Sequence, residues 1–213
     1  MSLGIFRTIG SVIFMYLLWR DLRSDYGDQK TINYTWMALA GFLVGGRIIY
    51  GLVNWGVWND SWLSWFSIWS KPGTNYLGGF LGLSLVSWLV AMKNQWKFLS
   101  LMDDIISPIL IFSSLLMFDE AIRTNLFIKP IVLFVLLIVD IFFVSWLRKK
   151  YRSFIWYKSG RKGFVLLFNN LLFFFAVGII LVLLKDSWFS VILASIISLI
   201  SGAGLYILKK EKI

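Results

Sequence analysis

The chain has 213 residues, of which 59% are hydrophobic and 15% charged, and its net charge is +10 at pH 7. This composition excludes a water-soluble domain, which needs more polar surface to cover its core, and indicates a membrane protein. The basic excess does not indicate a nucleic-acid partner, because membrane proteins collect Lys and Arg in cytoplasmic loops. The absence of Cys and His excludes disulfides and removes the commonest general base and metal ligand. We therefore expect no metal and no cofactor.

Seven mostly apolar segments follow one another along the chain, which is typical of membrane-spanning helices. They cover residues 3–19, 33–53, 76–92, 98–117, 130–147, 163–184 and 187–208. We predict an all-α polytopic membrane protein with seven transmembrane helices, in which residues 1–213 form a single integral membrane domain. The first segment is interpreted as a retained helix and not as a signal sequence, because Arg7 lies inside the apolar run and no small-x-small cleavage site follows.

Every second connection between the segments is rich in Lys and Arg, and the connections between these contain few. One set consists of residues 20–30, 93–97, 148–162 and 209–213, and it holds 15 of the 21 Lys and Arg residues. The other set holds Lys71, Arg123, Lys129 and Lys185. The positive-inside rule therefore places the N-terminus outside and the C-terminus inside.

The second connection is rich in tryptophan. Five of the chain's 12 Trp residues are Trp55, Trp58, Trp62, Trp65 and Trp69. This 3-4-3-4 spacing places all five indoles on one face of a helix. Because indole rings favour the membrane–water boundary, we predict an outer interfacial helix that anchors the protein. The alternative is a lateral gate through which a lipid enters.

Several polar residues lie within the predicted spans, where a charge is costly and therefore suggests function. Arg47 is deep in the second span, and Gly45 and Gly46 before it allow close approach of another backbone or a ligand. A guanidinium forks well onto a phosphate, so Arg47 is either a lipid-phosphate ligand or half of a buried ion pair with an aspartate. The other candidates are Asp103 and Asp104 at the start of the fourth span, Asp140 in the fifth, and Asn169 and Asn170 in the sixth. For Asp140 and the Asn pair, the favoured interpretation is interhelical hydrogen bonding.

Four short motifs occur in an order that resembles one enzyme family, prolipoprotein diacylglyceryl transferase. "GGRIIY" (45–50) resembles the family's G-G-R-x-x-Y, with Tyr50 at the position of the final Tyr. "WFSIW" (65–69) resembles the family's aromatic segment. "LGGFLG" (77–82) resembles H-G-G-L-I-G and contributes Gly78 and Gly79. "KFLSLMDDIISP" (97–108) resembles a basic loop followed by D-x-I-A-P, with Asp104 and Pro108 in register. The resemblance covers residues 35–110.

This resemblance implies a location and partners. The family enzyme is a multi-pass protein of the bacterial cytoplasmic (inner) membrane, and it transfers diacylglyceryl from phosphatidylglycerol to a lipobox cysteine. The expected partners are therefore phosphatidylglycerol, or a similar anionic membrane lipid, and a lipobox preprotein.

The chain departs from the family pattern at the positions that carry the chemistry. Leu77 stands where the family has the histidine of H-G-G, and Phe118 and Ala121 stand at the expected Arg and Asn of G-R-x-G-N-F. Arg123 is a candidate to replace the lost arginine from a shifted position. No obvious base remains, since a carboxylate such as Asp119 or Glu120 needs an upward-shifted pKa to help. Catalytic residues therefore stay unassigned.

Three hypotheses follow from the sequence. The chain is a divergent but active diacylglyceryl transferase, a catalytically silent relative that binds lipid or supports a partner as an accessory or scaffold, or a small transporter subunit. In the first two, Arg47 is the residue best placed to grip a lipid phosphate, with Asp104 as its counter-ion or as the group that orients it.

Overall fold

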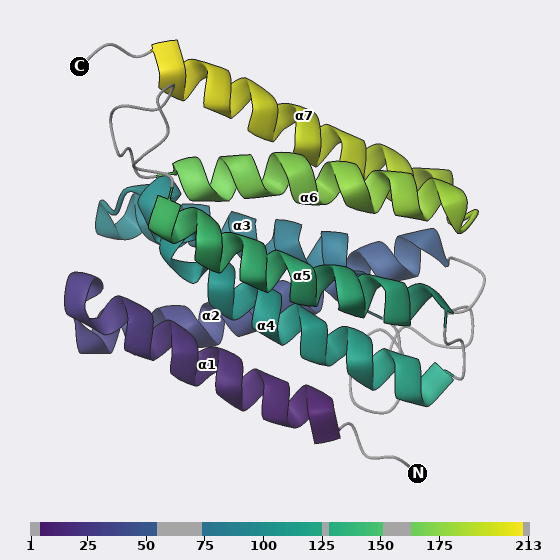
Figure 1. Ribbon diagram of the computed structural model, residues 1–213. Helices are drawn as coiled ribbons and strands as arrows, with labels where there is room; N and C mark the ends of the chain where they lie inside the picture. Colours follow the sequence, from purple (N-terminus) through teal and green to yellow (C-terminus); the bar gives the residue numbers. More distant parts are fainter. Residues whose placement is uncertain (1–4, 55–73, 125–127, 151–162, 211–213) are drawn as a thin grey trace.

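The computed structural model describes residues 5–54, 74–124, 128–150 and 163–210, which form seven α-helices (Figure 1). The helices are α1 (Ile5–Tyr26), α2 (Asp28–Val53), α3 (Tyr76–Asn94), α4 (Phe98–Thr124), α5 (Ile128–Lys150), α6 (Phe164–Leu183) and α7 (Trp188–Lys210). Six of them, α2 to α7, are long and apolar enough to cross a membrane. The prediction of an all-α membrane protein is therefore confirmed, and α1 is the helix that falls outside this group.

The helices extend into several segments that the sequence pattern assigned to connections. Residues 20–26 continue α1 and residues 28–30 begin α2, so the connection there shrinks to Gly27, whose φ is 82°. Likewise, α4 runs on through residues 119–124. Charged side chains mark where a helix leaves an apolar environment, but they do not end it. Pro108 also leaves α4 unbroken, so residues 98–117 form one continuous helix without a re-entrant turn.

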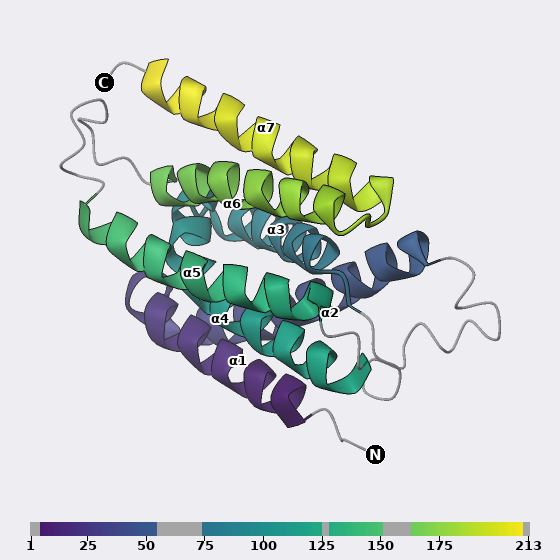
Figure 2. The same ribbon diagram turned by 45° about the vertical axis from the view of Figure 1, so that its right-hand side comes forward.

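α4 is the central helix of the bundle. It packs against α1, α3, α5 and α6. Of the most apolar 18-residue stretch of α4, 67% is buried inside the protein, against 22% of the corresponding stretch of α7. Figures 1 and 2 show α1 at one edge of the bundle and α7 at the opposite edge, where α7 packs mainly on α6. Within the described residues, α1 begins and α7 finishes at opposite ends of the bundle (Figure 1).

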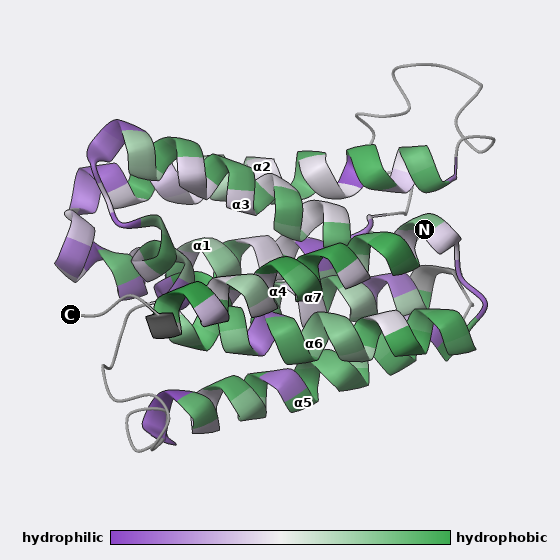
Figure 3. Ribbon diagram, turned by 90° about the horizontal axis from the view of Figure 1, so that it is seen from above, coloured by the Kyte–Doolittle hydropathy of each residue, from purple (hydrophilic) through white to green (hydrophobic). Residues whose placement is uncertain are grey.

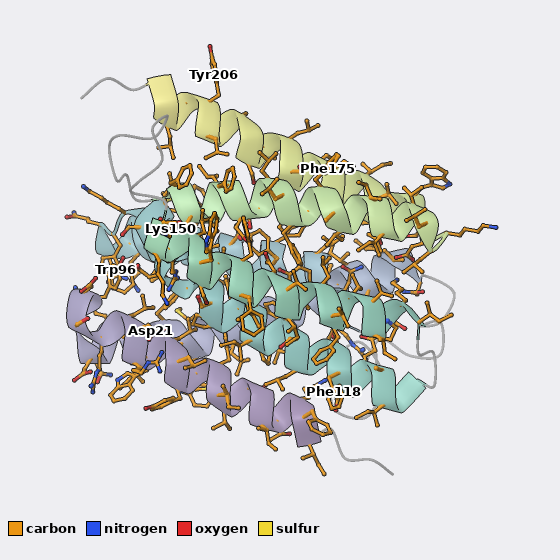
Figure 4. All side chains as sticks on the ribbon, viewed as in Figure 1. Asp21, Trp96, Phe118, Lys150, Phe175 and Tyr206 are labelled. Carbon is orange, nitrogen blue, oxygen red and sulfur yellow. The ribbon has the colours of Figure 1, made fainter. Side chains whose placement is uncertain are left out.

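The two ends of the bundle differ in character. We call the end where α1 begins the pocket end, and the end where α1, α3, α5 and α7 finish the basic end. Hydrophilic residues gather most densely at the basic end, and the middle of the bundle is predominantly apolar (Figure 3). Asp21, Trp96 and Lys150 lie at the basic end, whereas Phe118 lies toward the pocket end (Figure 4).

Large apolar side chains cover the outer faces of the helices. Tyr206 points away from α7 (Figure 4), and Phe142 and Leu199 are each more than 70% exposed. In water such a surface would be costly, whereas in a bilayer it faces lipid tails of the same polarity. The outer surface therefore agrees with the membrane assignment.

Glycines allow α2 and α3 to meet backbone to backbone. A Cβ added at Gly45 would collide with the carbonyl oxygen of Gly78, and one added at Gly82 would collide with that of Gly41. Small residues at such positions are the usual means by which membrane helices gain close packing. The "GG" pairs of both motifs, Gly45–Gly46 and Gly78–Gly79, thus serve this contact.

At the basic end, polar groups join α4, α5 and α6. Pro108 has no N–H to donate to the carbonyl oxygen of Asp104, four residues earlier. Arg148 of α5 donates instead, at 3.3 Å from that oxygen and 2.5 Å from the carbonyl oxygen of Asp103. The Asp103 carboxylate accepts the N–H groups of Gly163 and Leu166, and so caps the start of α6 from a neighbouring helix.

The glycine contact predicts a sharp difference between two Gly→Ala substitutions. Gly45→Ala should lower the melting temperature in detergent, because its methyl group meets the backbone of α3 and separates the helices at a cost of about 1–3 kcal/mol. Gly178→Ala is the matched control, since its nearest neighbour would be the Ser195 Oγ at 3.9 Å. We expect it to be neutral, or stabilising by up to about 1 kcal/mol through helix propensity. Equal melting temperatures for the two variants would contradict the close contact.

Candidate functional site

A cavity of about 760 Å³ lies at the pocket end, among the ends of six helices. Its apolar walls come from side chains such as Val53, Met117, Leu133 and Leu181. Its polar lining residues are Tyr50, Asn54, Thr74, Asn75, Tyr76, Glu120, Lys129, Asp186 and Ser190. A pocket with apolar walls and a few polar groups suits a ligand that has both a greasy part and a polar head.

The contact between α2 and α3 builds one wall of this cavity. The Gly46 carbonyl oxygen accepts the N–H of Asn75 at 3.0 Å, which holds the start of α3 against α2. The Asn75 side chain then caps α3, accepting the N–H of Leu77 at 2.9 Å. Leu77, at the position of the family histidine, is buried and lines the cavity. An apolar side chain thus stands where the family pattern has a titratable one.

Arg47 lies on α2 one helical turn before Tyr50, behind the residues that line the cavity. Its side chain is buried, and Tyr50, one helical turn further along α2, lines the cavity while Arg47 does not. Arg7 of α1 is close enough to Arg47 to interact with it electrostatically. Two guanidinium groups from different helices therefore share the interior of the pocket end.

The buried ion pair of this region is made by Arg7. Its Nη2 lies 3.6 Å from the Asp119 Oδ2, and both side chains are at most 4% exposed. The pair joins the first turn of α1 to the last part of α4. The sequence analysis assigned Arg7 no role, although the rule that singled out Arg47, a charge inside an apolar run, applies equally to Arg7.

Carboxylate and ammonium groups meet inside the cavity. The Lys129 Nζ lies 2.6 Å from the Asp186 Oδ2, an ion pair that links the first turn of α5 to the connection between α6 and α7. Glu120 also lines the cavity and interacts electrostatically with Lys129, Arg7 and Asp119. The hydroxyl of Thr74 is buried and makes no hydrogen bond within the described part of the structure. In the sequence, Lys129 counted only as a charge in a connection, and Asp186 was given no role.

Asp104 does not belong to this site. The Tyr26 hydroxyl donates to the Asp104 carboxylate at 3.4 Å, which places Asp104 at the basic end, beside the start of α2. Arg47 lies about 28 Å from that start along α2, at 1.5 Å per residue. The expectation that Asp104 acts as counter-ion or orienting group for Arg47 is therefore wrong. The two residues lie in parallel helices, Asp104 near the start of one and Arg47 near the end of the other.

Asp140 and Asn169 form the polar contact in the middle of the bundle. The Asn169 side-chain amide donates to the Asp140 Oδ2 at 3.1 Å, between α5 and α6, and both residues are buried. Interhelical hydrogen bonding was expected for Asp140 and for the Asn169–Asn170 pair, and this bond provides it for Asp140 and Asn169. Asn170 is also buried on α6, but none of the three lines the cavity.

Two predictions fall on parts of the chain that the structure does not describe. Arg123 lies in the last turn of α4, and its side chain is outside the described residues. The same holds for all five tryptophans of the predicted interfacial helix, Trp55, Trp58, Trp62, Trp65 and Trp69.

Comparison with known proteins agrees with the resemblance seen in the motifs. The family model for prolipoprotein diacylglyceryl transferase matches residues 2–117. The match extends the recognised segment to the whole of α1 and ends in α4 just before Phe118, where the chain departs from the family's G-R-x-G-N-F motif. Searches of curated proteins and of solved structures found no match. Because the matched segment is more than half of the chain, this protein belongs to the prolipoprotein diacylglyceryl transferase family.

Proposed function

We propose that this protein binds a membrane glycerophospholipid in the cavity at the pocket end, with the lipid phosphate held near Arg47. The observation that carries the proposal is one cavity whose apolar walls suit acyl chains and whose lining includes Glu120, Lys129 and Asp186. The Thr74 hydroxyl, which makes no hydrogen bond within the described residues, offers the headgroup one more polar contact. The family resemblance makes phosphatidylglycerol, or a similar anionic lipid, the first ligand to test.

Arg47 needs a small rearrangement to act in this way. Because Tyr50 and not Arg47 lines the cavity, a bound phosphate must either reach below Tyr50 or draw the guanidinium toward it. The Gly46 carbonyl fixes the backbone beside Arg47 to Asn75, so the side chain alone has to move. Arginine suits this role, since its planar fork donates two hydrogen bonds to one phosphate.

We propose further that α1 also crosses the membrane, which gives seven spans in the bacterial cytoplasmic membrane. α1 runs the length of α4, because Arg7 pairs with Asp119 at one end and Tyr26 bonds Asp104 at the other. Its outward face carries apolar side chains such as Val12 and Tyr16. With seven spans, the positive-inside rule puts the basic end in the cytoplasm and the pocket end outside.

Transfer of diacylglyceryl to a lipobox preprotein is the second candidate function, and the family membership favours it. The reaction needs a base to form the thiolate and a cationic cradle for the phosphate. Glu120 is a lining carboxylate that interacts electrostatically with the buried Arg7, while Leu77 supplies no base at the family position. We propose that the protein has kept lipid binding but has lost the transfer reaction. Its role is then that of an accessory or scaffold protein.

Orientation can be measured with single cysteines, because the chain has none of its own. Lys185→Cys at the pocket end should react with a membrane-impermeant thiol reagent added to intact cells. Lys97→Cys at the basic end should react only after the membrane is opened. Both side chains are exposed, so the reverse pattern would refute the proposed orientation.

Arg47 variants test the phosphate role. Arg47→Leu should keep a melting temperature close to that of the parent protein and lose co-purified phospholipid, measured by native mass spectrometry. Arg47→Lys keeps the charge but loses the fork, so it should retain part of the lipid. Arg20→Leu, at an exposed arginine of the basic end, is the matched control and should change neither quantity.

The opposite result identifies Arg47 as scaffold. A Leu variant that keeps its lipid but melts early would show that the guanidinium serves a buried charge partner, whose loss costs about 3–5 kcal/mol on the soluble-protein scale.

Catalysis is tested by incubating the purified protein with phosphatidylglycerol and a lipobox peptide. We expect no diacylglyceryl on the peptide cysteine by mass spectrometry, under conditions in which the lipid stays bound. Transfer of the group would establish the enzyme instead. In that case Glu120→Gln should abolish transfer, because Glu120 lines the cavity beside a buried arginine, whereas the other described lining carboxylate, Asp186, is paired with Lys129.

A further inference from the structure

We propose that Asp140 and Asn169, in the middle of the bundle, form a proton-binding site in which Asp140 is held as a neutral acid. Neither residue lines the cavity at the pocket end, so this inference is independent of the proposed lipid binding. It goes beyond the hydrogen bond already described, because that bond alone leaves part of the pair without a partner.

The position of Asp140 makes its ionised form costly. Asp140 is 6% exposed and lies about 15 Å from the nearer end of α5, at 1.5 Å per residue. Leu137 and Val144, one turn to either side of it, are buried apolar side chains on the same helix. A carboxylate charge in such surroundings needs a cation or several hydrogen-bond donors.

No cation meets Asp140 within the described residues, where it forms no ion pair. Of the helices that pack against α5, α6 carries no charged residue, and α4 carries none between Asp104 and Asp119. On α5 itself, the nearest charged residue is Arg148, about 12 Å further along the helix. Tyr76 of α3 is the ionisable group that interacts electrostatically with Asp140.

The Asn169 side chain uses one of its two polar ends. Its Nδ2 donates to the Asp140 Oδ2 at 3.1 Å, but its Oδ1 is buried and accepts no hydrogen bond within the described residues. An ionised Asp140 has no hydrogen to give, whereas a neutral carboxyl group has one O–H. A proton on the Asp140 Oδ1 therefore supplies the missing donor. The acid and the amide then join through two hydrogen bonds, which satisfies both buried groups.

A proton suits this pair better than a metal ion. Hard cations such as Mg²⁺ and Ca²⁺ take about six or more oxygen ligands. Within the described residues, no group of three acidic side chains could hold a metal ion, and this pair offers one carboxyl group and one amide oxygen. The proton needs only these two groups.

Tyr76 connects the site to the cavity. Tyr76 lines the cavity and interacts electrostatically with Asp140. A tyrosine hydroxyl both donates and accepts hydrogen bonds, so it can pass a proton between the cavity and the interior of the bundle. The pair thereby receives its proton from the pocket end.

Infrared spectroscopy of the purified protein tests the protonation state directly. At neutral pH the parent should show the C=O stretching band of a neutral carboxyl group, and Asp140→Asn should lose it. Asp140→Glu keeps an acid at this position and should shift the band, which assigns it even if the Asn variant does not fold. Asp25→Asn, at an exposed carboxylate of the basic end, is the matched control and should leave the band unchanged.

The same band reports the route of the proton. Tyr76→Phe keeps the ring but removes the hydroxyl, so the band should remain and should shift more slowly after transfer to heavy water. A shift as fast as that of the parent would contradict the route through Tyr76.

Melting temperatures provide a second test. Asn has the shape of a neutral Asp and can complete the same two hydrogen bonds, so Asp140→Asn should melt with the parent at mildly acidic pH. The folded parent keeps a proton that the unfolded chain releases, so its stability should fall as the pH rises. At mildly alkaline pH we therefore expect the parent to melt several degrees below Asp140→Asn.

Three results would overturn the inference. One is a parent spectrum without the neutral band, and another is an Asp140→Asn variant that melts well below the parent at every pH. The third is stabilisation of the parent, but not of Asp140→Asn, by sodium chloride and not by choline chloride, which would identify a metal cation as the ligand. None of these results depends on lipid retention, so failure of this inference is distinguishable from failure of the proposed function.

Discussion

The direct contact between the backbones of α2 and α3 is the constraint on which the pocket end depends. Gly41, Gly45, Gly78 and Gly82 bring the two helices so close that a single methyl group would collide with a carbonyl oxygen. At this distance the Gly46 carbonyl reaches the N–H of Asn75, and the start of α3 is fixed beside the last turns of α2. The wall that carries Tyr50, Leu77 and Tyr76 follows from that one arrangement.

The family's packing motifs and its chemical motifs have separate physical bases, and this sequence matches the packing motifs more closely. The glycine motifs serve helix packing, and their loss would disrupt the fold whatever the protein does. Leu77 and Phe118 occupy positions of the chemistry, where an apolar residue leaves the packing undisturbed. Leu77 is buried in the cavity wall, and the Phe118 ring packs against those of Phe6 and Phe134, at 5.0 and 5.4 Å between centroids.

Hydropathy was enough to predict the helices, since each apolar segment became one, but it misplaced their ends. Residues 20–26 and 119–124 carry charged side chains yet are helical, because a charged side chain near a helix end can meet a polar environment or, like Asp119, a buried partner. The charged site was harder to predict, since the partners of each ion pair, Arg7 with Asp119 and Lys129 with Asp186, come from distant parts of the chain. Only the packing of the helices brings these partners together, and the local spacing of residues in the sequence does not predict such contacts. For the same reason the sequence offered Asp104 as a partner for Arg47, although the two lie at opposite ends of the bundle.

Pro108 has a mechanical consequence. By leaving the Asp104 carbonyl without its helical donor, it creates an anchor point that Arg148 occupies, while Asp103 ties the start of α6 to the same turn of α4. These contacts join α4, α5 and α6 at one level of the bundle and fix their relative positions along the bundle axis. At the far end, α5 is tethered to the α6–α7 connection through the half-exposed side chain of Lys129. The helices around the cavity are therefore joined by polar contacts at both ends, partly buried ones at the basic end and a half-exposed ion pair at the pocket end.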